Sequence, residues 1–233
     1  MPRRYLIVDD NLPLAENLAE MLEGTGAEAT VAGGAREALA LAKNGRFDAL
    51  ITDMRMPEMS GLDLMRELRQ VDPGLPVLLV TAYTTDSDLN AVRRYGLLGI
   101  LPKPIPPGRL LELTSAARRN GTVAIVDDDR ALLENLSEAL QLSGFATVTA
   151  GALSDLDDVD VSPFAAVVDL HFPGAPEGAS VLTLNRRFPA VPQVIITAFP
   201  ETEHGEAAAV LIKPFQVKAL LETITSLYTE PAR

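Results

Sequence analysis

An internal repeat constrains the fold more than any other feature of this sequence. The segment YLIVDDNLPLAENL, residues 5–18, returns as VAIVDDDRALLENL, residues 123–136, with the same order of apolar run, adjacent aspartates and helical spacing. A repeat at this distance divides the 233 residues into two domains, which we expect at residues 1–120 and 121–233. Each half is long enough to bury a hydrophobic core of its own.

Both halves alternate short apolar runs with longer stretches of helical spacing, a pattern typical of a parallel sheet covered on both faces. The expected strands of the first half are YLIV, EATV, ALIT, VLLV and GIL. Those of the second half are VAIV, ATV, AAVV, QVIIT and AVLI. The predicted class is therefore α/β, with two doubly wound, five-stranded parallel sheets.

Helices are expected between these strands. In the first half they lie near residues 14–23, 35–43, 62–70, 86–95 and 108–119, and in the second near 131–142, 179–187 and 217–227. The other two helices of the second half are expected to be short. Residues 151–164 are acidic and leave little room, and residues 199–209 allow only one or two turns.

Composition excludes several kinds of site. The chain has no cysteine, so disulfides, thiolate catalysis and thiolate metal sites are excluded, and any metal must bind through oxygen or nitrogen. No apolar run approaches the ~18 residues of a membrane span. The first ten residues do not contain the apolar region of a signal peptide, so we expect a cytoplasmic protein without a membrane partner.

The net charge of −12 is distributed unevenly. Residues 1–120 carry 14 basic and 16 acidic side chains, a net charge of −2, whereas residues 121–233 carry 6 and 16, a net charge of −10. The second half is therefore expected to repel nucleic acid. Three arginine pairs could contact partners, although solvated helix faces are favoured: Arg93–Arg94, Arg118–Arg119 and Arg186–Arg187.

Chemically active side chains follow the expected strands of the first half. They are Asp9, Asp10, Asp53, Thr81 and Lys103. Because the carboxyl ends of parallel strands meet at one edge of a sheet, these side chains are expected to converge there. Crowded carboxylates are costly to ionise together, and a magnesium ion would offset their charge. The paired aspartates therefore predict a Mg²⁺ site.

With these residues at the strand ends, both halves resemble receiver domains of bacterial two-component response regulators, which have a flavodoxin-like fold. The matching residues of the first half are Asp9–Asp10, Asp53 in ITDMRMPEMSG, Thr81–Ala82 in LLVTAY and Lys103–Pro104 in ILPKPI. Those of the second half are Asp127–Asp128, Asp169 in VVDLHFPG, Thr197–Ala198 in IITAF and Lys213–Pro214 in LIKPF. The resemblance covers nearly the whole chain.

The resemblance implies a role for each position. Asp53 and Asp169 would accept a phosphoryl group from a histidine kinase or a histidine phosphotransfer protein. Thr81 or Thr197 and Lys103 or Lys213 would contact that group, and each Lys–Pro bond would suit a cis peptide. Mg²⁺ would be held by the three aspartates of each half and by the backbone carbonyls of Arg55 and His171, so the metal set is Asp9, Asp10, Asp53, Arg55, Asp127, Asp128, Asp169 and His171.

Each of these residues, taken alone, also has a simpler structural interpretation. Asp9–Asp10 could cap the first helix, Thr81 could be an ordinary strand-end hydroxyl, and Lys103 could be a solvated loop residue. Five positions matching in order, twice, favour the receiver site. His171 and His204 each stand alone, so a surface or packing role is expected for both rather than catalysis or metal binding by the imidazole.

The two halves differ in two ways. Six residues are missing between Thr197 and Lys213 relative to the interval from Thr81 to Lys103. The second half is thus expected to present a different output surface, and dimerisation, where it occurs, is expected through the first domain. Receivers usually place an aromatic residue three positions before the lysine. Ile100 and Val210 stand there, while Tyr83 and Phe199 are displaced, so the usual coupling of threonine to an aromatic residue is not expected.

No output domain is expected, because the chain ends directly after the last predicted helix. A tandem receiver that acts through protein contacts and is not an enzyme, apart from slow self-dephosphorylation, is the favoured function. One alternative is that the chain is the amino-terminal part of a longer regulator with an effector domain. Another is a Mg²⁺-dependent phosphohydrolase that uses an aspartyl phosphate. Such enzymes typically show D-x-D at the first strand, whereas the acids here are adjacent.

Overall fold

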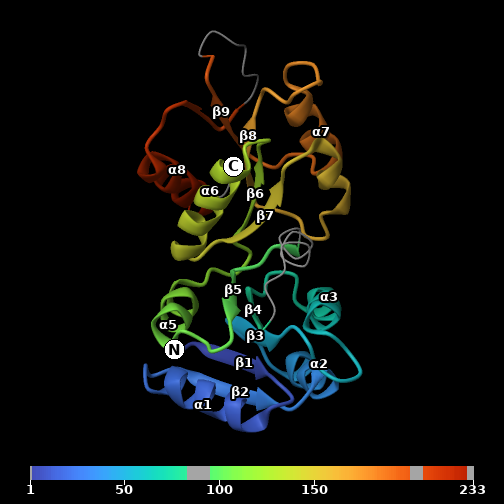
Figure 1. Cartoon of the computed structure of the whole chain (residues 1–233), viewed down its shortest axis with the longest axis vertical. Coiled ribbons are helices and arrows are strands. Elements are labelled where there is room, and N and C mark those ends of the chain that lie inside the picture. The colour runs from blue at the N-terminus through green and yellow to red at the C-terminus, as the bar shows by residue number, and fades with distance from the viewer. Residues whose placement is uncertain (1, 83–94, 200–206, 230–233) are drawn as a thin grey trace. The chain divides into compact units, whose positions relative to one another are not determined.

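The computed structural model describes residues 2–82, 95–199 and 207–229 (Figure 1). Apart from residues 93–96, the chain divides between Asn120 and Gly121 into two compact units. Each contains one five-stranded sheet in which all pairings are parallel. The predicted α/β class with two doubly wound sheets is therefore confirmed.

The sheet of the first unit has the strand order β2-β1-β3-β4-β5. Its strands are β1 (Arg4–Val8), β2 (Glu28–Ala32), β3 (Ala49–Asp53), β4 (Val77–Thr81) and β5 (Gly99–Pro102). The strands β1, β3 and β4 are apolar over almost their whole length and are almost fully buried, as expected for strands covered on both faces. The order reverses between β1 and β3, where doubly wound sheets usually form their ligand sites.

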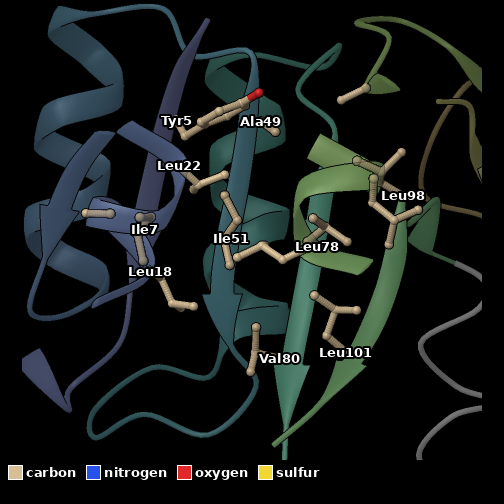
Figure 2. Close-up of a cluster of buried hydrophobic side chains, with 14 of the residues drawn as sticks. Tyr5, Ile7, Leu18, Leu22, Ala49, Ile51, Leu78, Val80, Leu98 and Leu101 are labelled. Carbon is tan, nitrogen blue, oxygen red and sulfur yellow. The ribbon is translucent and has the colours of Figure 1, made fainter. Parts of the chain in front are cut away.

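Helices cover both faces of this sheet (Figure 1). They are α1 (Leu12–Glu23), α2 (Ala35–Asn44), α3 (Gly61–Val71) and α5 (Pro107–Ala116). Figure 2 shows the core on one face, where side chains of α1 such as Leu18 and Leu22 pack against Ile7, Ile51 and Leu78 of the strands. The helix predicted at residues 86–95 falls almost wholly outside the described residues.

The second unit repeats this arrangement with the strand order β10-β9-β8-β6-β7. Its strands are β6 (Thr122–Val126), β7 (Ala146–Ala150), β8 (Ala165–Asp169), β9 (Gln193–Thr197) and β10 (Ala209–Ile212). Because β6 corresponds to β1 and β10 to β5, the strand neighbours are the same as in the first unit. All five expected strands are confirmed.

Helices α6 (Arg130–Leu142) and α8 (Val217–Thr229) share one core with one face of the second sheet. On the other face, α7 (Ala179–Arg187) packs together with a single 3₁₀ helix, η2 (Leu153–Asp158). The short acidic helix predicted within residues 151–164 is this six-residue 3₁₀ segment. The short fourth helix predicted within residues 199–209 lies mostly outside the described residues.

Strand β10 forms an edge of the second sheet and is only half covered. Ala209 and Leu211 pack against the core that includes α6 and α8. The alternate residues Val210 and Ile212 are 37% and 50% exposed. This edge therefore presents apolar side chains to solvent.

The junction of the two units corrects one sequence expectation. Helix α5 ends at Ala116, so Arg118–Arg119 does not lie on a helix face. Arg119 is turned inward instead: its guanidinium donates to both carboxylate oxygens of Asp72, at 2.5 and 2.6 Å, and to the backbone oxygen of Phe47. The carboxylate at the end of α3 attracts Arg119 away from solvent, and the expectation of a solvated side chain was wrong.

The other two arginine pairs of the sequence analysis differ from Arg118–Arg119. Arg186 and Arg187 end α7 and are both exposed, as expected for a solvated helix face, although Arg187 also donates to the backbone oxygen of Val159 at 2.8 Å and lies over the ring of Phe188 at 4.9 Å. Arg93–Arg94 lies outside the described residues. Within the described ranges, no helix is both long enough and apolar enough to cross a membrane.

Candidate functional site

Strand ends bring the predicted residues of the first unit to one edge of the sheet. Asp9 directly follows β1, Asp53 ends β3 and Thr81 ends β4. The backbone N–H of Lys103 donates to the Thr81 carbonyl at 2.9 Å, and that of Asp9 donates to Ala32 at 3.3 Å. Local sheet hydrogen bonds therefore fix the backbone from which each functional side chain extends.

Lys103 joins the two most buried carboxylates of this edge. Its Nζ donates to Asp9 Oδ2 and to Asp53 Oδ2, both at 2.8 Å. The remaining oxygens accept backbone N–H groups, Asp9 Oδ1 from Asn11 at 2.9 Å and Asp53 Oδ1 from Arg55 at 3.3 Å. Burial alone would lower the pKa of Lys103, but the hydrogen bonds to Asp53 and Asp9 raise it above its ordinary value. Lys103 is thus a bound cation, not a solvated loop lysine.

The second unit builds the same arrangement. Lys213 Nζ donates to Asp127 Oδ2 and Asp169 Oδ2, again both at 2.8 Å. Asp127 Oδ1 accepts from the backbone of Asp129 at 2.8 Å, and Asp169 Oδ1 from His171 at 3.1 Å. The two acidic sites therefore match contact for contact.

Burial is deeper in the second site. Asp127 is 0% exposed, and its burial raises its pKa, although the hydrogen bond from Lys213 acts in the opposite direction. The pKa of Lys213 is also raised, because its contacts with Asp127 and Asp169 outweigh its own burial. Buried carboxylates are stable only with cations close by, and Lys213 supplies one.

Each site contains a donor set that fits a magnesium ion. In each unit, three aspartates offer carboxylate oxygens that lie within 4.8 Å of one another, namely Asp9, Asp10 and Asp53 in the first and Asp127, Asp128 and Asp169 in the second. Mg²⁺ prefers such hard oxygen ligands. Asp10 and Asp128 are exposed, so both sets are open to solvent on one side.

The paired aspartates do not cap the helices that follow them. Asn11 caps α1, with its side chain accepting from Leu14, and Asp129 caps α6 by accepting from Ala131 and Leu132. These two residues also hold the first aspartate of each pair through their backbone N–H groups. The sequence analysis did not identify them, although asparagine and aspartate are preferred N-caps and directly precede both helices.

The structure places the histidine of the second site against an aromatic ring. His171 lies with its ring centroid 4.7 Å from that of Phe199, and its Nε2 lies 3.9 Å from Glu177 Oε1. Thr197 Oγ1 accepts from the backbone of Phe199 at 3.0 Å. Both Lys–Pro bonds, Lys103–Pro104 and Lys213–Pro214, are cis as predicted. Tyr83 and His204 lie outside the described residues.

Two hydroxyl groups contact the backbone of the central aspartates. Thr52 Oγ1 donates to the Asp53 carbonyl at 3.1 Å, and Ser180 Oγ donates to the Asp169 carbonyl. Both hydroxyl-bearing residues are fully buried. Sequence reasoning missed this contact in both units, because neither residue stands at a position of the receiver motif.

Comparison with known proteins decides the family. The family model described as response regulator receiver domain matches residues 5–115. A response regulator receiver protein of Anaeromyxobacter sp. (strain Fw109-5) is 47% identical over 229 residues, which cover 98% of this chain and 96% of that protein. This chain belongs to the response regulator receiver family.

Other similar proteins match this chain over about the length of one unit. Response regulator MprA of Mycolicibacterium vanbaalenii is 37% identical over 122 residues, 52% of this chain and 53% of MprA. A solved response regulator receiver protein from Pseudomonas putida covers 49% of this chain and 97% of its own, with 37% identity and a TM-score of 0.47. The family match, the near full-length relative and the repeated strand order together confirm the predicted receiver resemblance of both halves.

Proposed function

We propose that the protein is a tandem-receiver response regulator, with domains at residues 1–120 and 121–233, that accepts a phosphoryl group on Asp53 and on Asp169. One observation carries the proposal: both units hold two aspartates and a lysine in the same contacts, with all four lysine–carboxylate distances at 2.8 Å. A degenerate second domain would have no physical reason to keep a buried charge cluster, because such clusters are costly to desolvate.

The side chains divide the chemistry among them. A carboxylate oxygen of Asp53 or Asp169 attacks phosphorus, the bond to the donor nitrogen or oxygen breaks, and the donor leaves with that electron pair. Lys103 or Lys213 offsets the charge on the phosphoryl oxygens from the position it already holds. The three aspartates of each unit, together with the backbone carbonyl of Arg55 or His171, would hold a Mg²⁺ ion, which would supply further positive charge beside the phosphoryl oxygens.

The hydroxyls of Thr81 and Thr197 are the groups that would report phosphorylation to the rest of each unit. Both residues are buried at the end of a strand next to the one bearing the phosphoacceptor. Phe199 is 54% exposed and contacts His171, so it does not occupy the position of the usual aromatic partner of the threonine. Signal output in the second unit therefore depends on another route.

Phosphate would come from a histidine kinase or a histidine phosphotransfer protein in the cytoplasm, and output would go through protein contacts. The charge of −10 in the second half favours a basic protein partner over nucleic acid or a second copy of itself. Dimerisation is assigned to the first unit. Slow self-dephosphorylation is the single catalytic activity assigned to the chain.

Acetyl phosphate provides a direct test. With Mg²⁺, intact-protein mass spectrometry should show up to two added phosphoryl groups. Asp53→Asn should remove one and Asp169→Asn the other, while Asp63→Asn, which changes an exposed acid on α3, should remove neither. Label that persists in the double variant would refute the assignment of the acceptors.

The phosphohydrolase alternative predicts turnover. Sustained hydrolysis of a generic phosphomonoester that depends on Asp53 or Asp169 would favour the enzyme. We expect only slow loss of the aspartyl phosphate, because within each site the first acid of the pair is already engaged by lysine and by a backbone N–H. That engagement leaves it poorly placed to act as a general acid.

A further inference from the structure

The backbone of the second phosphoacceptor is tied to a helix. Ser180 lies in the first turn of α7 and is 0% exposed, and its hydroxyl donates to the backbone carbonyl of Asp169. Asp169 itself is 7% exposed. A hydrogen bond in so buried a place is costly to lose, because no water can replace the missing donor.

In the first unit, the hydroxyl that donates to the carbonyl of the phosphoacceptor comes from a strand instead of a helix. The carbonyl of Asp53 accepts from Thr52 Oγ1 at 3.1 Å, so the donor belongs to β3 itself. The first turn of α3, residues 61–64, contains no hydroxyl side chain. It begins at Gly61, where an added Cβ would lie 2.1 Å from the Asp53 oxygen. In the second unit Val168 takes the place before the phosphoacceptor and has no hydroxyl.

We propose that Ser180 is a positioning residue for the phosphoacceptor Asp169, and that Thr52 serves Asp53 in the same way; this inference rests on the proposed function. The hydroxyl fixes the peptide plane that follows the aspartate. Leu170 joins that plane to the next peptide, whose N–H, that of His171, donates to Asp169 Oδ1 at 3.1 Å, while Lys213 holds Oδ2 at 2.8 Å. The carboxylate therefore keeps the orientation needed for attack.

Because the hydroxyl donor belongs to a strand in the first unit and to a helix in the second, the two phosphoacceptor sites would respond differently to a partner protein. In the first unit the positioning contact is local to one strand, so it persists as long as β3 does. In the second it requires α7 to stay docked against the end of β8. A protein that displaces α7 would thus slow phosphorylation of Asp169, and the corresponding displacement of α3 would leave the Thr52 contact with Asp53 intact.

Ser180→Ala in the full-length Asp53→Asn protein tests the inference, because only Asp169 can then be labelled. We expect the initial rate of labelling by acetyl phosphate with Mg²⁺ to fall about tenfold, the loss typical of one buried hydrogen bond. Ser143→Ala is the matched control. It also removes a hydroxyl that donates to a backbone carbonyl, that of Ala139 at 3.1 Å, but at the far end of α6. Its labelling rate should not change.

A rescue variant separates positioning from packing. Adding Val168→Thr to Ser180→Ala places a hydroxyl where the first unit has that of Thr52, and it should restore the rate to within about threefold of the parent. An unchanged rate in Ser180→Ala, or a slow rate that Val168→Thr does not restore, would overturn the positioning role while Asp169 remained a phosphoacceptor. No label on the Asp53→Asn parent would overturn the proposed function of the second unit as well.

Discussion

The two units contain the same arrangement of site residues, but the helices around it differ. Their strands have the same neighbours, and each lysine makes two contacts of 2.8 Å with the aspartates. Their helices differ: a ten-residue α2 stands in the first unit where the second has the six-residue η2. The comparison shows that strand ends define the site and that the helix following β2 or β7 can be shortened without moving it.

The largest expected effect is on the rate of phosphoryl labelling when the lysine of one site is replaced. Lys103→Met should slow labelling of Asp53, and Lys213→Met labelling of Asp169, each by about 100-fold, because each removes the cation that contacts the carboxylate of the proposed phosphoacceptor. The rates are measured with acetyl phosphate in proteins whose other phosphoacceptor is asparagine. Lys218→Met removes a lysine that is 81% exposed and should have no effect. Strongly unequal losses would show that the two sites are not chemically equivalent.

A smaller effect is expected at the junction. Arg119→Ala should lower the free energy of unfolding of the first unit by about 2 kcal/mol, since it removes a partly buried, two-pronged contact with Asp72. Hydrogen exchange in β1 and β3 reports this loss separately from the second unit. Arg36→Ala is the control, because its ion pair with Glu58 is 84% exposed on the arginine side and should contribute under ~1 kcal/mol. Equal losses in both units would show instead that the junction stabilises them together.

The smallest expected effect is a gain in stability. The pKa of Asp127 is raised by burial, so its ionised form is less stable in the folded chain than in the unfolded chain. This cost is absent below the ordinary pKa of about 3.8 and is complete once the pH exceeds the raised, folded-state value. Asp127→Asn should therefore raise the midpoint of thermal unfolding slightly at pH 7 without Mg²⁺, and leave it unchanged near pH 3. A lower midpoint at pH 7 would mean that the contact with Lys213 outweighs burial.

Much of the fold and the site follows from local patterns in the sequence. Apolar runs predict all ten strands, because strands covered on both faces must be apolar along their length. The site residues follow from their place after those runs, since parallel strands end at a common edge. The long periodic helices, such as α7 at Ala179–Arg187, are also located correctly.

What escaped prediction depends on contacts between distant parts of the chain. Nothing near Arg119 in the sequence indicates that Asp72 will neutralise it, and nothing near Ser180 indicates that its hydroxyl will meet the Asp169 carbonyl. The end of the last helix of the first unit was predicted wrongly for the same reason: α5 stops at Ala116, whereas the sequence predicts a helix that continues to residue 119. Tertiary contacts override such weak local preferences.

The half-covered strand β10 has a consequence for how the protein behaves in a crowded solution. Within the described residues no further strand pairs with the outer side of β10, where Val210 and Ile212 are exposed, and strands of other molecules can add to such an edge. Ten excess negative charges on the same half of the chain oppose that approach. The negative charge of the second unit thus opposes aggregation through β10. This protection weakens as added salt shortens the range of electrostatic repulsion.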